Sequence, residues 1–188
     1  MHGCGITASM LIGSPFILVE SKDRCWKCHT VQRVIALASS RISDGDMDSM
    51  DEGFSNDPFL LRNIETLPVE LVKWFATNEL HFRPFFSKKA NMKYFTNLCP
   101  QCGANFGDHF LHELGGAFSP QTPEEAARLS IRTLPVQGDF ELRAGYVSGA
   151  GELILQFANQ GSRPNRIAAE PCASSKSSKW WWPWSKLR

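Results

Sequence analysis

The sequence lacks the features of several specialised protein classes. No run of about 18 apolar residues occurs, which excludes a membrane-spanning helix. The 20 Lys and Arg residues nearly balance the 19 Asp and Glu residues, and the net charge of +1 favours neither a nucleic acid nor a membrane as a partner. With 43% hydrophobic and 21% charged residues, the chain is not wholly disordered, collagen-like or a coiled coil. Its 188 residues predict one globular domain with a small appendage.

Two further absences concern export and catalysis. The first 20 residues contain no Lys or Arg and no cleavage site of the A-x-A type, both of which mark secretory signals. We therefore expect the chain in the reducing cytoplasm, where CxxC pairs bind metal more often than they form disulfides. No Gly-rich phosphate loop, nucleophile elbow or other catalytic motif occurs, and we expect a protein that is not an enzyme.

Four of the six cysteines form two CxxC pairs. Two residues between thiolates let a tight turn point both sulfurs at one ion, and zinc binds four such ligands at tetrahedral corners. The pairs predict a Zn²⁺ site with four thiolate ligands: Cys25, Cys28, Cys99 and Cys102. Residues 29–98 separate the pairs, which is more than the roughly 15–20 residues inside a compact zinc finger and predicts a long insertion. The two remaining cysteines are predicted not to bind the metal: Cys4 and Cys172.

Two other interpretations of these cysteines stay open. The run CWKCH at residues 25–29 matches C-x-x-C-H, the pattern for covalent attachment of a c-type haem. Haem attachment requires export, however, and gives Cys99 and Cys102 no role. The pairs could also be unrelated buried thiols.

A short helix is predicted over residues 107–114, directly after the second pair and stopped by two glycines. It carries a cluster that a metal-dependent enzyme could use, with the glutamate as general base: Asp108, His109, His112 and Glu113. The spacing matches neither H-E-x-x-H nor H-x-x-E-H. We expect three residues to brace the thiolates as hydrogen-bond partners instead: His29, His112 and Glu113.

Apolar, β-prone residues on both sides of the first CxxC predict strands at 15–20 and 31–38, joined by the cysteine-bearing turn as in a zinc-knuckle hairpin. Residues 67–80 predict an amphipathic helix, since Leu71, Trp74 and Phe75 recur at helical spacing.

Later elements complete the expected fold. The capping box at 122–125 predicts a helix over 123–130. Alternating apolar residues in 139–147 and 152–158 flank a Gly-rich turn and predict a β-hairpin. The expected class is α+β: a zinc-ribbon or treble-clef-like β core with a long helical insertion between the two CxxC knuckles and a C-terminal β-hairpin.

One segment has a positive net charge and is the best candidate for contact with nucleic acid. Basic and aromatic residues alternate over 81–97, and such a mixture can neutralise phosphates and stack on bases. The candidate binding residues are Arg83, Lys88, Lys89, Lys93 and Tyr94. The alternative is that the aromatic residues belong to the core and the lysines are merely solvated.

We assign residues 12–159 to a single zinc-stapled domain that contains an acidic loop at 39–58, and residues 160–188 to a disordered, basic tail. Tryptophan among Lys and Arg is an interfacial combination. The tail could bind a protein partner as an adaptor, touch a membrane surface, stack on single-stranded nucleic acid or fold back on its domain. Its candidate contact residues are Trp180, Trp181, Trp182 and Trp184.

The residues from the first CxxC to the short helix resemble a group of poorly characterised bacterial zinc-ribbon proteins. Their pattern is an early CxxC after a strand, then a strand with Tyr or Phe that leads into N-x-C-x-x-C-G-A and G-D-x-F-L-H. Here these stand as Cys25/Cys28, Tyr94-Phe95, residues 97–104 and residues 107–112. The resemblance covers about residues 15–120 and implies zinc on the four cysteines.

Overall fold

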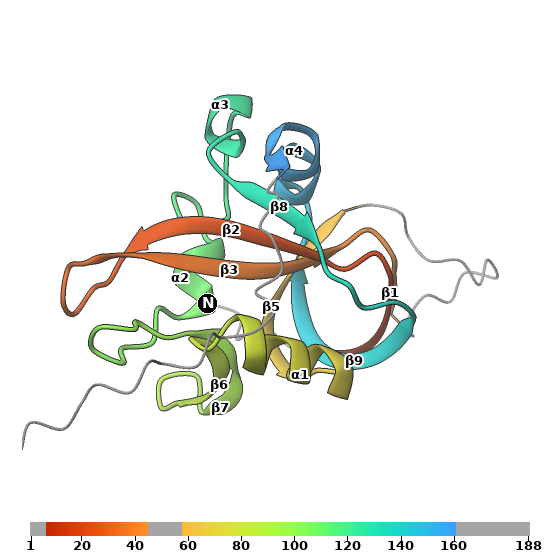
Figure 1. The fold of residues 1–188 in the computed structure, drawn as a ribbon, viewed down its shortest axis with the longest axis horizontal. Coiled ribbons are helices and arrows are strands. Elements are labelled where there is room, and N and C mark those ends of the chain that lie inside the picture. The colour runs from red at the N-terminus through yellow and green to blue at the C-terminus, as the bar shows by residue number, and fades with distance from the viewer. Residues whose placement is uncertain (1–6, 45–57, 161–188) are drawn as a thin grey trace, which may run out of the picture.

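The computed structural model describes residues 7–44 and 58–160, which form a ten-stranded sheet and four short helices (Figure 1). The strands are β1 (Ala8–Gly13), β2 (Ile17–Arg24), β3 (Val31–Ser39), β4 (Ile42–Asp44), β5 (Phe59–Thr66), β6 (Phe82–Ser87), β7 (Met92–Asn97), β8 (Ser130–Thr133), β9 (Asp139–Val147) and β10 (Asn159–Gln160). The helices are α1 (Val69–Asn78), α2 (Asp108–His112), α3 (Pro123–Ala126) and α4 (Ala150–Phe157). The α+β class is therefore confirmed at this level.

The main path of the sheet runs in the order β10-β8-β2-β3-β5-β9-β1-β4, and the β6–β7 hairpin attaches to it through β5. Among the described residues, only β8 and β10 pair in parallel. The short strand β4 lies at one end of this path and pairs with β1.

Strands β2 and β3 form a long hairpin that carries the first CxxC at its tip. Their register runs from Ile17↔Ala38 to Arg24↔Val31. Side chains of a strand alternate between the two faces of a sheet, and here both faces are buried at this hairpin, for example at Leu37 and at Ala36. Burial on both faces explains the continuous apolar run in β3 and confirms the strands predicted on either side of the first pair.

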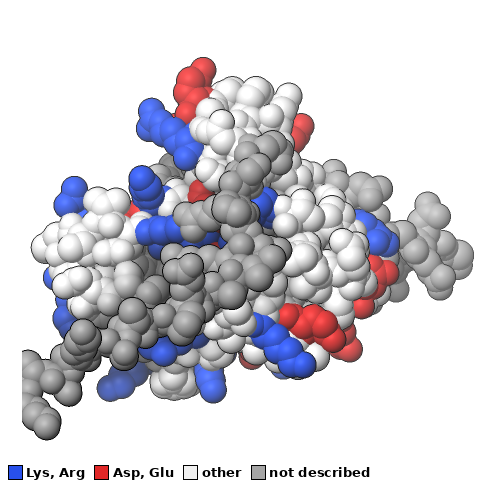
Figure 2. Space-filling view, in the orientation of Figure 1, with Lys and Arg blue, Asp and Glu red and all other residues white. Residues whose placement is uncertain are grey.

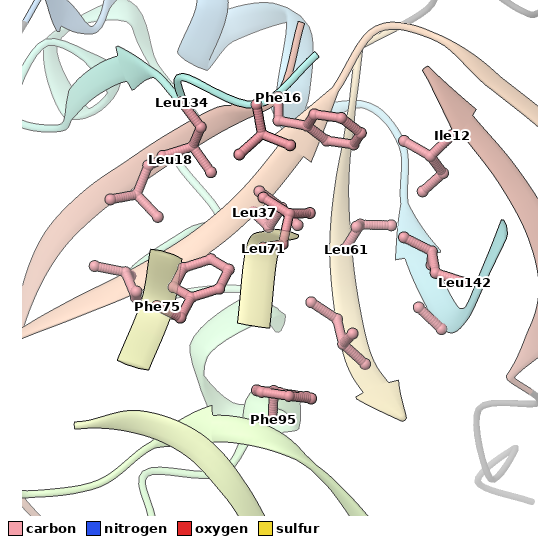
Figure 3. Close-up of a cluster of buried hydrophobic side chains, with 14 of the residues drawn as sticks. Ile12, Phe16, Leu18, Leu37, Leu61, Leu71, Phe75, Phe95, Leu134 and Leu142 are labelled. Atoms are coloured by element: carbon pink, nitrogen blue, oxygen red, sulfur yellow. The ribbon is translucent and has the colours of Figure 1, made fainter. Parts of the chain in front are cut away.

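The core consists of two apolar clusters on opposite faces of the sheet. Figure 3 shows the first, in which Leu18, Leu37 and Leu61 of the sheet lie near Leu71 and Phe75 of α1. The second cluster lies beneath the knuckles, α2 and α4, and its members include Val19, Val34, Leu60, Phe106, Leu111, Phe118, Leu129, Ile131 and Ile154. Both CxxC pairs belong to this second face, so metal ligation and core packing are joined there.

Helix α1 confirms the amphipathic helix predicted at 67–80. Leu71 and Phe75 lie one turn apart and are almost completely buried, and Pro68 precedes the first turn. The C-cap of the helix is Glu79, a buried residue at the junction of α1 with the sheet.

Two arginines and two glutamates form a charge-balanced network of ion pairs between the end of α1 and the sheet. Arg33 forms an ion pair with Glu20 at 2.6 Å and another with Glu79. Arg132 pairs with the same two carboxylates and lies over the Trp74 ring, 4.9 Å from its centroid. Although burial opposes it, hydrogen bonds to the two glutamates raise the pKa of Arg33.

Two parts of the predicted fold are wrong. Residues 150–157 form helix α4 instead of the second strand of a C-terminal hairpin, and β9 pairs with β1 and β5. Gly151, Ile154 and Ala158 are buried at spacings of three and four, which is a helical face. At Gly151 an added Cβ would lie 2.3 Å from the Pro58 carbonyl oxygen, so this position permits close packing of α4 on the chain before β5.

The insertion between the knuckles is also not mainly helical. It contains β3, β4, β5, β6 and β7 and only one helix, α1, among the described residues. The predicted capping box is present, since Thr122 accepts a hydrogen bond from the Glu125 N–H, but α3 ends at Ala126 because β8 begins shortly afterwards. Most of the predicted acidic loop (45–57) and the predicted tail (161–188) lie outside the described residues.

Candidate metal centre

The four cysteines of the two CxxC pairs converge on one point. All four sulfurs lie within 4.8 Å of one another, and the pairs Cys25–Cys102 and Cys28–Cys99 are each separated by 3.6 Å between Sγ atoms. A disulfide requires about 2.05 Å, so these are free thiols. A tetrahedron with Zn–S bonds of about 2.3 Å has sulfur–sulfur edges of about 3.8 Å, which fits the observed spacing. The predicted ligand set is therefore a possible metal site.

The two knuckles have the same backbone geometry. In the first, the Cys25 N–H donates to the Thr30 carbonyl and the His29 N–H donates to the Cys25 carbonyl, both at 2.9 Å. In the second, the Cys99 and Gly103 N–H groups make the equivalent bonds at 2.8 Å. The residue after each second cysteine has a positive φ, 59° at His29 and 71° at Gly103. Gly tolerates this left-handed conformation readily, whereas His29 adopts it at some cost.

A polar link from β7 to β3 positions the second knuckle relative to the first. Asn97, two residues before Cys99, accepts a hydrogen bond from the Ile35 N–H at 2.8 Å and donates one to the Ile35 carbonyl at 2.9 Å. Its side chain thus takes the place of a neighbouring strand, because β5 pairs with β3 only at Ala38 and Ser39. A buried polar side chain that satisfies two backbone groups of a distant strand specifies a single arrangement of the two segments.

The knuckles also contact each other directly at Trp26. The indole Nε1–H of Trp26, between the first two cysteines, donates to the Asn105 carbonyl at 2.8 Å. Asn105 follows the second knuckle and forms an isolated bridge with Leu98. The exposed Trp26 side chain therefore links the first knuckle to the chain that follows the second.

A hydroxyl group interacts with the sulfur of Cys28. Thr30 Oγ1 lies 2.9 Å from Cys28 Sγ and in turn accepts a hydrogen bond from Gln32 Nε2. The Thr30 side chain, followed by its backbone N–H, lowers the pKa of Cys28 from 9.0 to about 6. A thiolate is the form that binds a metal, so this hydrogen bond prepares Cys28 for ligation.

The predicted bracing residues lie elsewhere. His29 is exposed and contributes its backbone, and His112 Nδ1 donates to the Asp108 carbonyl at 2.8 Å. Glu113 is exposed and lies 3.1 Å from His109. Within residues 7–44 and 58–160, none of the three predicted side chains has a hydrogen bond to a cysteine sulfur, and Thr30 holds that position instead.

The cluster considered for catalysis is divided between the interior and the surface. Asp108 is buried, accepts a hydrogen bond from the Asn63 N–H at 2.7 Å and lies 3.2 Å from the Thr96 hydroxyl, which donates to Asn105. Burial raises the pKa of Asp108 and lowers the pKa of His112. His109 and Glu113 project from the other side of α2. The four groups therefore do not face one shared substrate position.

The aromatic residues of the β6–β7 hairpin are also divided between the interior and the surface. Phe82, Tyr94 and Phe95 are almost fully buried and belong to the core. Tyr94 is 4% exposed, which corrects the prediction that its ring binds nucleic acid. The four basic candidate residues of the hairpin are exposed, which both interpretations of this segment allow: Arg83, Lys88, Lys89 and Lys93. Phe85 and Phe86 are exposed as well.

Basic side chains collect at the end of the molecule that holds the knuckles and this hairpin. In Figure 2, blue Lys and Arg side chains are spread over the left half, which corresponds to the β2–β3 tip and β6–β7 in Figure 1. Most of the visible red carboxylates lie at the top and the right. On the face that Figure 2 shows, the near-neutral total charge therefore conceals an uneven distribution of basic and acidic side chains.

Comparison with known proteins gives no match: no family model, no curated protein and no solved structure is significantly similar to the chain. Among the described residues, no helix combines the length and the apolar character needed to cross a bilayer. The four tail tryptophans singled out from the sequence lie outside the described residues.

Proposed function

We propose that the protein is a non-enzymatic zinc protein of the cytoplasm, in which Zn²⁺ bound by the four clustered cysteines stabilises a surface that binds nucleic acid. The observation that carries the proposal is the convergence of four sulfurs from two knuckles of equal backbone geometry. Four thiolates in this arrangement suit zinc or an iron–sulfur centre. The resemblance to bacterial zinc-ribbon proteins favours zinc of the two.

The role of the zinc follows from its four protein ligands. Four thiolates complete a tetrahedron and leave no open coordination position for a substrate, so the metal acts in folding. It joins the tip of β2–β3 to the segment between β7 and α2, which is a treble-clef-like arrangement of a knuckle hairpin and a knuckle followed by a helix. The ion thereby fixes the relative position of two surface segments that are far apart in sequence.

Nucleic acid is proposed as the partner because exposed cations lie on the first knuckle and on the β6–β7 hairpin, which leads into the second knuckle. The first knuckle contributes Arg24 and Lys27, and the β6–β7 hairpin contributes its four exposed basic residues. The two groups are connected through Asn105, which contacts Trp26 and the Tyr94 hydroxyl. Such a cluster can neutralise several phosphates at once, and release of their counterions provides binding free energy.

The test measures how binding depends on salt. The zinc-loaded full chain is titrated into a fluorescein-labelled 20-nucleotide oligonucleotide, and anisotropy is recorded between 50 and 200 mM KCl. We expect the affinity to fall steeply with salt, and the slope of log K against log[salt] to lose about one unit for each phosphate contact removed in Lys88→Glu and Lys89→Glu. The matched control is Arg128→Glu, a charge reversal at an exposed position after α3, which should leave the slope unchanged.

Absent or salt-independent binding would overturn the nucleic-acid proposal. In that case, the adaptor function based on the Trp-rich residues 180–184 becomes the better hypothesis. It predicts that deletion of residues 172–188 abolishes binding to a protein partner while the zinc content is retained.

A further inference from the structure

We propose that the surface around Asn105 selects single-stranded nucleic acid, because three segments that Asn105 connects each carry an exposed aromatic ring that can stack on unpaired bases. The rings belong to Trp26, Phe85 and Phe110 and come from three separate segments: the first knuckle, β6 and α2. The inference rests on the proposed function and specifies the class of nucleic acid bound.

Asn105 is the hub of this surface. Its carbonyl accepts the Trp26 indole N–H at 2.8 Å, and its side-chain Oδ1 accepts hydrogen bonds from the Thr96 hydroxyl and the Gly107 N–H, each at 2.8 Å. Its Nδ2 lies 3.4 Å from the Tyr94 hydroxyl. One residue, through its backbone carbonyl and its side chain, thus ties together the two knuckles, β7 and the start of α2.

The register of the β6–β7 hairpin places Phe85 on this side. Phe85 pairs directly with Tyr94, and paired residues of an antiparallel ladder project from the same face. Because the Tyr94 hydroxyl contacts Asn105, Phe85 shares the face directed toward the hub, and it is 37% exposed. Phe86 pairs with Lys93 and therefore projects from the opposite face.

Phe110 adds a ring from α2, next to Gly107, whose N–H donates to Asn105. It lies in the first turn of α2, three residues after Gly107, and its side chain is 60% exposed. Lys89 from the hairpin lies over this ring, 5.2 Å from the centroid, so α2 and the hairpin are in contact here. The ring is therefore held beside a cation that can bind a phosphate next to a stacked base.

The exposure of these rings distinguishes the two forms of nucleic acid. Trp26 is 65% exposed although its N–H is fixed to Asn105, so an immobilised ring face is available to a ligand. The faces of bases are accessible in a single strand but covered by neighbouring base pairs in a duplex. Stacking on an aromatic side chain therefore strengthens single-strand binding, by roughly fivefold to a hundredfold per base, and gives nothing to a duplex.

Cations lie beside each ring, as a phosphate backbone requires. Lys27 follows Trp26 in the knuckle, and Arg83 projects from the same face of β6 as Phe85. Lys89 accompanies Phe110. A strand that crosses this surface can therefore place its bases on the rings and its phosphates near the three basic groups.

The experiment compares two ligands with two matched phenylalanine variants. Anisotropy titrations of the zinc-loaded full chain use labelled oligo(dT) of 20 nucleotides and a labelled 20-base-pair duplex at the same salt concentration. We expect the single strand to bind at least tenfold more tightly. Phe85→Ala should weaken its binding by fivefold or more without changing duplex binding, whereas Phe86→Ala, an equally conservative change on the opposite face of the hairpin, should change neither.

Phe110→Ala provides an independent variant, because its exposed side chain contributes little to folding. It should reproduce the effect of Phe85→Ala, and the zinc content of each variant checks that the fold is retained. Equal or tighter duplex binding, or equal effects of Phe85→Ala and Phe86→Ala, would overturn the inference. If Lys88→Glu and Lys89→Glu still weaken both ligands, the proposed function survives that failure, whereas absence of binding to both ligands overturns both proposals.

Discussion

The side chain of Asn97 provides the sharpest test of how the metal centre is positioned. It is 5% exposed and satisfies both backbone groups of Ile35, at a point where β3 has no neighbouring strand on that side. Replacement by Ala leaves a buried N–H and a buried carbonyl without partners, each at a cost of about 1–3 kcal/mol. A water molecule admitted to the space left by the side chain can pair one of them. We therefore expect Asn97→Ala to lower the free energy of unfolding by about 2–4 kcal/mol.

Urea unfolding of the zinc-loaded protein, followed by far-UV circular dichroism, measures this loss. With a denaturant dependence of about 2 kcal/mol/M, in the middle of the usual range, the midpoint should fall by about 1–2 M. The same variant should release zinc faster to a colorimetric chelator, because the second knuckle loses its attachment to β3. The control is Asn78→Ala, which removes one exposed hydrogen bond to the Trp74 carbonyl and should cost less than about 1 kcal/mol. A loss for Asn97→Ala no larger than the control would refute the reasoning.

Three further predictions concern the packing around the centre. Burial lowers the pKa of His112 below its ordinary value of 6.5, so its contribution to the free energy of unfolding should be full above pH 6.5 and fall as the pH drops below it. His112→Phe should flatten this dependence in pH-resolved urea melts, and an unchanged slope would contradict this cause. Glu79→Gln should cost about 1–3 kcal/mol in the same assay by weakening the partly buried pair with Arg33, and an unchanged midpoint would mean that the pair is dispensable. Gly151→Ala should cost about 1–3 kcal/mol in thermal melts because its Cβ overlaps the Pro58 carbonyl, and a neutral effect would show that α4 can shift freely.

Local sequence patterns predicted the elements that local interactions determine. The strands on both sides of Cys25 and Cys28, helix α1 and the capping hydrogen bond of Thr122 all depend on residues a few positions apart. The ligand set was predictable for the same reason, because CxxC spacing restricts the turn that each pair forms. Convergence of the pairs on one ion was a chemical expectation, and the structure brings their sulfurs together.

The errors arose where distant contacts decide the outcome. The apolar run at residues 153–155 fits a buried strand or a buried helix, and the close approach of Gly151 to Pro58 selects the helix. The interleaved basic and aromatic residues near Tyr94 did not indicate which face was buried, because this depends on the pairing of β7 with β6 and β5 and on contact with Asn105.

Two residues that support the centre were missed. Thr30 could have been identified from the sequence, because its hydroxyl lies only two residues beyond Cys28 and the knuckle turn brings it to the sulfur. Asn97 gave only the weaker signal of a polar residue in an apolar strand close to a ligand, and its partner in β3 is distant in sequence.

The identity and ligation of the bound metal test the central claim most directly. The full chain is purified under reducing conditions, its metal content is determined by mass spectrometry, and its X-ray absorption spectrum is recorded. We predict one zinc per chain with four sulfur neighbours at about 2.3 Å, lost in Cys99→Ser and Cys102→Ser but retained in Cys172→Ser. Iron, haem, or zinc with nitrogen or oxygen neighbours would contradict a closed structural site formed by the two CxxC knuckles.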